Sequence, residues 1–160
     1  MNNFDKFNFQ PFINEALTAK GFVQPTEVQE KLIPLIAKGK NIVGQSQTGS
    51  GKTHTFLLPL FNKIDATKEE VQVVITAPSR ELAAQIYKAA NQLAQFSSPE
   101  IRVSNFVGGT DKQRQLDRLR HQQPHVVVGT PGRILDMMNE QALKIHTAFA
   151  FVVDEADMTL

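Results

Sequence analysis

The 160-residue sequence contains no cysteine, carries little net charge and has no long hydrophobic run. The absence of cysteine excludes disulfides and thiolate metal sites, and it is compatible with a reducing compartment. The formal net charge is only +1, so overall charge gives no indication of a nucleic-acid partner. The amino terminus lacks a signal-peptide pattern, and no apolar run approaches membrane-spanning length. We therefore expect a cytoplasmic protein that makes no contact with a membrane.

The composition is that of a globular protein. Hydrophobic residues make up 41% of the chain, and with the nine glycines they lie in the usual globular range. The length suits one domain with its own core, and we find no internal repeat or interdomain linker. The four histidines lack the spacing of metal ligands, so we expect them to be surface or structural residues. One domain is therefore expected over residues 1–160.

Short apolar runs alternate with longer stretches of helical periodicity, which predicts βαβ units and a mostly parallel sheet. Most of the runs are continuously apolar, so helices are expected on both faces of the sheet. The expected strands are 41–44, 71–76, 102–107, 126–129 and 149–154. The expected helices are 11–20, 27–37, 52–64, 80–95, 112–121 and 132–138, with Thr26, Ser79 and Asp111 among the capping residues. The expected fold class is α/β.

The segment Gln45–Thr53 follows the first apolar run, leads into a helical pattern and resembles a Walker A loop. In such a loop glycine N–H groups surround the β-phosphate, Lys52 reaches the β- and γ-phosphates and Thr53 ligates magnesium. Ser46 stands where the general pattern has glycine, and an ordinary glycine-rich turn is the alternative. The strand before it and the helix after it favour phosphate binding. The expected nucleotide contacts here are Gln47, Thr48, Gly49, Ser50, Gly51, Lys52, Thr53 and Thr55.

The last apolar run delivers carboxylates at its end, where ligands bind in open α/β sheets. Asp154 is placed to hold magnesium, directly or through water, and Glu155 to orient and deprotonate the water that attacks the γ-phosphate. The alternative is a solvated acidic turn. Together with the phosphate-binding turn, these carboxylates favour an NTPase in which Lys52, Asp154 and Glu155 are catalytic and Thr53 and Asp154 hold the metal.

The order of these motifs is similar to that of the DEAD-box ATP-dependent RNA helicases, whose name is spelled by residues 154–157. The resemblance spans nearly the whole chain, extends to bacterial cold-shock-type members and implies the first RecA-like P-loop NTPase lobe, with ATP and Mg²⁺ as cofactors. Residues 21–29 resemble the adenine-reading Q motif, within an adenine-recognition segment at 1–29. The implied adenine contacts are Phe4, Phe22, Gln24 and Gln29. A Gln amide can match the N6/N7 edge of adenine; the alternatives are a polar helix-face residue for Gln29 and a packing aromatic for Phe4.

Three further segments are similar to the RNA-contacting motifs of the family, and each follows an expected strand. The implied RNA contacts are Pro78, Ser79, Arg80, Gly108, Gly109, Thr130, Pro131, Gly132 and Arg133. N–H groups, hydroxyls and guanidinium groups at helix starts bind phosphate without reading bases, so these contacts imply RNA binding without sequence preference. Taken singly, each has a local explanation as a surface charge, a first-turn proline or a turn glycine. Ser79 replaces the threonine that is usual in the family.

The resemblance also implies that the chain stops before the Ser-Ala-Thr motif strand and lacks the second RecA-like lobe. Loss of that strand predicts a central gap between the Walker A and Asp-Glu strands, and hence marginal stability, oligomerisation or strand exchange. The complete protein is expected to couple ATP hydrolysis to RNA clamping and local duplex unwinding, whereas this lobe alone is expected to have little activity. The alternatives are a P-loop ATPase lobe acting on DNA or protein, and a non-catalytic nucleotide- or RNA-binding module.

Overall fold

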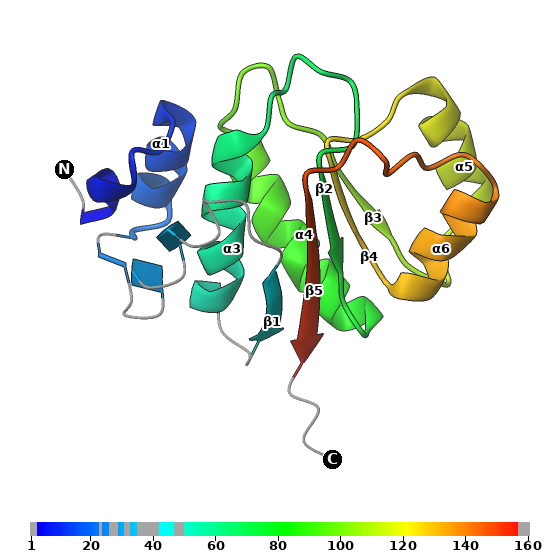
Figure 1. Cartoon of the computed structure of the whole chain (residues 1–160), viewed down its shortest axis with the longest axis horizontal. Helices are drawn as coiled ribbons and strands as arrows, with labels where there is room; N and C mark the ends of the chain where they lie inside the picture. The colour runs from blue at the N-terminus through cyan, green and yellow to red at the C-terminus, as the bar shows by residue number, and fades with distance from the viewer. Residues whose placement is uncertain are drawn as a thin grey trace.

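The computed structural model of the chain describes residues 3–22, 24–25, 29–30, 33–34, 42–46 and 50–156, with the backbone alone for 3, 42–46, 50–52, 54 and 154–156. Five strands form one sheet, and every described pairing between them is parallel (Figure 1). The strands in spatial order are β1 (Ile42–Ser46), β5 (Ala150–Ala156), β2 (Val73–Thr76), β4 (Val126–Gly129) and β3 (Val103–Phe106). The α/β class is confirmed, and each expected strand is found within two residues of its predicted bounds.

Five described α-helices and a short 3₁₀ helix surround the strands. They are η1 (Asn3–Phe7), α1 (Pro11–Ala19), α3 (Ser50–Lys63), α4 (Arg80–Ala94), α5 (Lys112–His121) and α6 (Pro131–Asn139). The helix expected over 27–37 lies largely outside the described residues, as does its cap Thr26. The other two caps are confirmed: Ser79 accepts from the Leu82 N–H and Asp111 from the Arg114 N–H, each at 3.1 Å. None of the helices described is both long and apolar enough to span a membrane.

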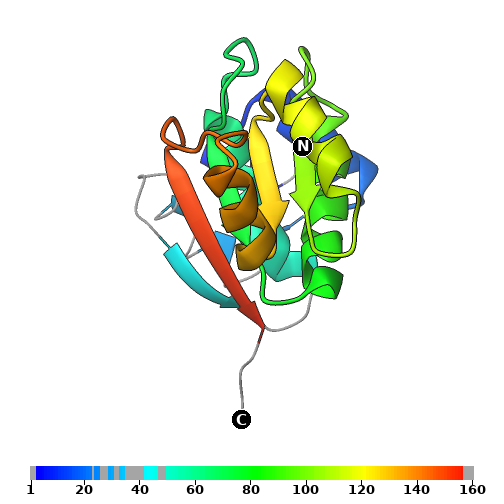
Figure 2. The same cartoon turned by 90° about the vertical axis from the view of Figure 1, so that its right-hand side faces the viewer.

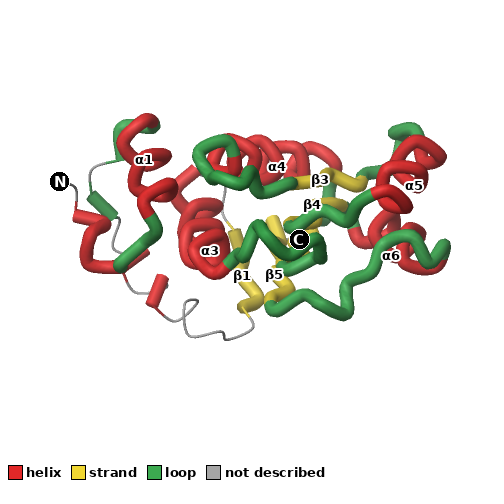
Figure 3. The backbone as a smooth tube through the Cα atoms, turned by 90° about the horizontal axis from the view of Figure 1, so that it is seen from above, coloured by secondary structure: helices red, strands yellow, loops and turns green. Residues whose placement is uncertain are grey.

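Successive strand residues alternate between two apolar clusters, one on each face of the sheet. The first cluster joins α1, α3 and α4 to strand residues that include Val73, Ile75, Val126, Val128 and Val152. The second joins α5 and α6 to Val74, Val127 and Phe106. Seen from above, α1 lies beside α3 at the end of the molecule remote from α5 and α6 (Figure 3). Strands β2 and β4 therefore have helices on both faces, as their apolar runs predict.

Strand β5 differs, because one of its faces is open. Val152 is 4% exposed on the first face, whereas Phe151 and Val153 on the other face are 44% and 39% exposed. Phe151 lies beside Val74, so its face is the one that α5 and α6 cover elsewhere. These helices follow β3 and β4 and pack over that side of the sheet (Figure 2). The sheet as a whole carries helices on both faces, as predicted, but among the described residues one face of β5 is left open.

The expected central gap is also absent from the described sheet. β1 pairs with β5 along its whole length, from Ile42 beside Val152 to Ser46 beside Ala156. Backbone N–H and C=O groups of a buried strand need partners, and direct pairing supplies them. The prediction of a gap is therefore wrong, and the expectation of strand exchange, which rested on it, loses its structural support.

Candidate nucleotide and nucleic-acid site

Apart from the adenine-recognition segment at 1–29, the expected binding segments lie at or just after the ends of strands that share one edge of the sheet. Because the strands are parallel, their carboxyl ends share this edge, which lies at the bottom of Figure 1. In open α/β sheets ligands bind at this edge. The fold therefore places the nucleotide segments and the RNA-contacting segments on the same side of the molecule.

The two halves of the expected nucleotide site lie at the ends of neighbouring strands. β1 leads into α3, which begins at Ser50, and β1 lies directly beside β5. In the register of this pair Gly44 lies beside Asp154 and Gln45 beside Glu155. The backbones thus bring the start of the phosphate-binding turn next to the acidic end of β5. Gln47, Thr48 and Gly49 lie outside the described residues, and the contacts of Ser50, Gly51, Lys52, Asp154 and Glu155 remain predictions.

The donor set at this place suits magnesium. Thr53 lies in the first turn of α3 and is partly exposed. A hydroxyl, a carboxylate and phosphate oxygens are the hard ligands that Mg²⁺ prefers. Thr55, two residues further along, is buried at 4% exposure. Within the part of the chain that the structure describes, no group of three or more His, Asp or Glu side chains forms another metal site.

The residues expected to read adenine flank α1 in the sequence. Gln24 is exposed and Phe22 is half-buried against the first apolar cluster. Gln29 is 3% exposed and Phe4 1% exposed, and the Phe4 ring lies 6.2 Å from that of Phe7. Phe4 is therefore a core aromatic in this structure, as the packing alternative predicts. A stacking role would require its ring to become accessible, so adenine contact by these residues remains a prediction.

The three segments expected to contact RNA are joined by hydrogen bonds. The Arg80 Nη1 donates to the Gly108 carbonyl at 3.1 Å, which connects the first segment to the second. The Arg133 Nη1 donates to the Thr110 carbonyl at 3.5 Å, which connects the third to the second. The Thr130 N–H also donates to the Phe106 carbonyl at 3.0 Å. The structure thus brings together segments that are more than fifty residues apart in sequence.

Gly109 shows why a glycine occupies this turn. Its φ is +84°, in the left-handed region that residues with a side chain seldom adopt. A methyl group on Gly109 would also overlap the Arg80 Nη1. The glycine therefore permits both the turn and the contact between Arg80 and Gly108. Ser79 belongs to the first of the three segments. Its side-chain oxygen caps α4 by accepting from the Leu82 N–H, and its O–H can still donate to a phosphate.

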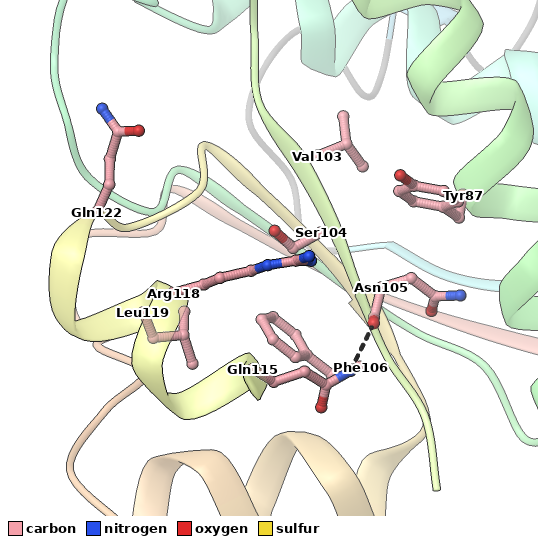
Figure 4. Close-up of a pocket in the computed structure, with 9 residues that line it drawn as sticks. All are labelled: Tyr87, Val103, Ser104, Asn105, Phe106, Gln115, Arg118, Leu119 and Gln122. Atoms are coloured by element: carbon pink, nitrogen blue, oxygen red, sulfur yellow. Dashed lines mark hydrogen bonds between the residues drawn. The ribbon is translucent and has the colours of Figure 1, made fainter. Parts of the chain in front are cut away.

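The sequence interpretation missed Gln115, a half-buried residue of α5 that is hydrogen-bonded to β3, to the Thr110 hydroxyl and to Arg133 of the third segment. Its Nε2 donates to the Thr110 Oγ1 at 3.0 Å and to the Asn105 carbonyl at 3.3 Å, and its Oε1 accepts from the Arg133 Nη1 at 2.9 Å. It also lines a cavity of about 230 Å³ between α4, β3 and α5 (Figure 4). No sequence signal distinguishes Gln115 from the polar residues around it on the same helix.

The comparisons with known proteins agree with this arrangement. The family model described as DEAD/DEAH box helicase matches residues 26–160. The chain is 58% identical to the DEAD-box ATP-dependent RNA helicase CshB of Listeria monocytogenes and 54% identical to CshB of Bacillus subtilis. These matches cover 99% and 98% of this chain but only 36% of each relative, so the chain spans about a third of their length.

Solved structures give the same result. A DEAD box protein from the hyperthermophile Methanococcus jannaschii matches with a TM-score of 0.85 and 36% identity, covering 98% of this chain and 42% of that one. Saccharomyces cerevisiae Dbp5 bound to RNA and ADP BeF3 matches with a TM-score of 0.80 and 28% identity, covering 96% and 38%. With the family model matching most of its residues, the chain belongs to the DEAD/DEAH box helicase family.

Proposed function

We propose that the chain is the ATP-binding lobe of an ATP-dependent RNA helicase that couples ATP hydrolysis to RNA clamping and local duplex unwinding. One observation carries the proposal: the phosphate-binding turn follows β1, the acidic motif ends β5, and the RNA-contacting segments follow the adjoining strands β2, β4 and β3, all at one sheet edge. The names of the curated relatives and the nucleotide and RNA in the Dbp5 complex support it. The proposed compartment is the cytoplasm, which supplies both ATP and RNA.

On the nucleotide side, the N-terminus of α3 offers backbone N–H groups and a helix dipole to the phosphates. Lys52 would contact the β- and γ-phosphates, while Thr53 and Asp154 would hold Mg²⁺, which neutralises charge on the phosphate oxygens. Glu155 would accept the proton of the attacking water and direct its oxygen at the γ-phosphorus. Charge stabilisation by an arginine of a second lobe is worth about 10³- to 10⁵-fold in related NTPases, so this lobe alone would turn over slowly.

On the RNA side, the guanidinium groups of Arg80 and Arg133 would pair with backbone phosphates. The Nη1 atom of each arginine donates to a carbonyl of the Gly108–Thr110 turn. The other N–H groups of each guanidinium could then donate to a phosphate. Backbone N–H groups at the starts of α4 and α6 would bind further phosphate oxygens. Such contacts fix the strand without reading bases, so we expect little sequence preference.

Substitution of Lys52 in the complete protein tests the proposal. Lys52→Ala removes the cation expected at the β- and γ-phosphates and should lower RNA-stimulated ATP turnover by about 10²- to 10³-fold, the usual effect of losing one transition-state contact. The matched control is Lys63→Ala, an exposed lysine in the last turn of the same helix, which should leave turnover unchanged. Magnesium-dependent binding of a fluorescent ATP analogue is measured alongside. Wild-type turnover in Lys52→Ala would refute the proposal.

The alternative functions differ in ligand. A lobe acting on DNA would bind single-stranded DNA as well as RNA of the same sequence at a fixed salt concentration. A non-catalytic module would bind nucleotide without turnover in the complete protein. Competition between the two nucleic acids, followed by an ATPase measurement, separates these alternatives from the RNA helicase.

A further inference from the structure

We propose that Gln115 is a positioning residue, which orients the Arg133 guanidinium toward a phosphate of the bound nucleic acid. The inference rests on the proposed function, because it assigns the Gln115 amide a part in RNA binding. Gln115 lies one turn beyond Asp111, the N-cap of α5, and its side chain reaches back toward the sheet edge. Figure 4 shows its amide directed at β3 and its hydrogen bond to Asn105.

Both ends of the Gln115 amide are used. The Nε2 group donates to the Asn105 carbonyl and the Thr110 hydroxyl, which fixes the amide against β3 and the glycine turn. The Oε1 atom is then directed at the Arg133 Nη1, 2.9 Å away. A glutamate would reverse the polarity at Nε2, and an apolar side chain would make none of the three bonds. The site therefore requires a group that donates and accepts at once.

The Asn105 carbonyl needs such a donor because β3 is the last strand in the described sheet. The carbonyls of Arg102 and Phe106 accept bonds from the β4 side, so the alternating carbonyls of β3 point away from β4. Asn105 is one of these outward residues. Gln115 thus donates to an outward carbonyl of the edge strand β3. This bond holds the Gln115 amide in place, so that its oxygen can orient Arg133.

Fixing the Arg133 side chain before RNA binds should strengthen RNA binding. An arginine that is free in solution loses rotamer freedom when it engages a phosphate, which corresponds to roughly 2- to 12-fold in affinity for one side chain. In this structure Nη1 is held by the Gln115 oxygen and the Thr110 carbonyl. The remaining donors of the guanidinium fork stay available for a phosphate. Loss of Gln115 should therefore weaken RNA binding without removing any charge.

The experiment uses the complete protein with a non-hydrolysable ATP analogue and a fluorescein-labelled oligouridylate, followed by anisotropy at several salt concentrations. Gln115→Met should weaken RNA affinity by about 3- to 10-fold. The matched control is Gln113→Met on the same helix. Exposed Gln113 donates a hydrogen bond to Asp117 and none to the described RNA-contacting residues, so this variant should leave affinity unchanged. Arg133→Met should weaken binding at least as much as Gln115→Met and reduce the salt slope by about 0.7.

The double variant Gln115→Met with Arg133→Met decides between positioning and general structural support. If Gln115 acts through Arg133, the double variant should bind no more weakly than Arg133→Met alone. Additive losses would overturn the inference. A loss in Arg133→Met with none in Gln115→Met would overturn it while leaving the proposed function intact, whereas no RNA binding by the unmodified protein would overturn both.

A folding defect is monitored by thermal melting and by the affinity for the ATP analogue, both of which should match those of Gln113→Met. If Gln115→Met does not fold, Thr110→Val replaces it. This variant removes the hydroxyl that accepts from the Gln115 Nε2 and itself donates to the Val107 carbonyl, and it keeps the Thr110 carbonyl that accepts from Arg133. Thr110→Val should give a smaller loss of RNA affinity that also vanishes in the Arg133→Met background. Persistence of the loss in that background would overturn the inference.

Discussion

Strands β4 and β5 flank the same central strand, β2, yet they are buried to different extents. All four residues of β4 are buried between the two apolar clusters. β5 is equally apolar over its first four residues, but it buries Val152 on one face and exposes Phe151 and Val153 on the other. The difference shows that an apolar run specifies a strand, whereas burial of each face depends on where the neighbouring helices pack.

The same contrast separates the two parts of the proposed site. The RNA-contacting segments follow the strands covered by α5 and α6, and hydrogen bonds from Arg80, Gln115 and Arg133 connect them. The acidic motif begins within the last residues of β5, the strand with the open face. We therefore expect substitutions to act differently on the two sides of β2.

The largest difference in the free energy of unfolding is expected between two substitutions on opposite sides of β2. Met137 of α6 is fully buried in the second cluster, so Met137→Ala should lower the free energy of unfolding by about 2–5 kcal/mol. Phe151→Ala removes a larger side chain that is already 44% exposed, and should cost less than about 1 kcal/mol. Urea denaturation of the two variants gives the comparison. Equal losses would show that the open face of β5 is as well packed as the covered one.

A smaller change in stability is expected from substitution of two glycines on the part of the sheet that α5 and α6 cover. Gly129→Ala would place a methyl group over the Phe106 carbonyl, which is backbone and cannot easily move, so we expect a loss of about 1–3 kcal/mol. Gly132→Ala, in the first turn of α6, meets nothing within 4 Å and should be neutral or stabilising by up to about 1 kcal/mol. Melting temperatures distinguish the two. Equal melting temperatures for the two variants would contradict the close approach of β3 and β4 at Gly129.

The smallest effect concerns pH. His125, just before β4, is fully buried, and its Nδ1 accepts from the Arg102 N–H at 2.9 Å. Burial, aided by the charge of Arg102, lowers the pKa of His125 below its ordinary value of 6.5. The unfolded chain therefore binds a proton at His125 more readily than the folded chain does. The free energy of unfolding should have its full value above about pH 6.5 and should decline as pH falls toward the lowered pKa.

Unfolding free energies measured at neutral and mildly acidic pH check this dependence. The control is His146→Gln, which replaces an exposed histidine in the loop before β5 and should leave the decline unchanged. His125→Gln should flatten it. A decline that survives His125→Gln would assign the acid sensitivity to other groups.

The sequence predicted the elements well because their signals are local. Apolar runs, helical periodicity and the caps Ser79 and Asp111 depend on residues close together in the chain, and strand and helix bounds followed within two residues wherever the structure describes them. It failed where partners are distant. The pairing of β1 with β5 and the open face of β5 depend on elements that meet only in the folded chain.

The site divides in the same way. Family membership and the identity of the candidate phosphate, metal and RNA contacts were determined by the sequence, because motifs combine residue type with short spacing. Only the tertiary structure decided that Arg80, Gly108 and Arg133 belong to one hydrogen-bonded network and that Gln115 connects it. The physical reason is that an amide has no fixed role of its own, and its hydrogen bonds depend on which donors and acceptors the fold brings within reach.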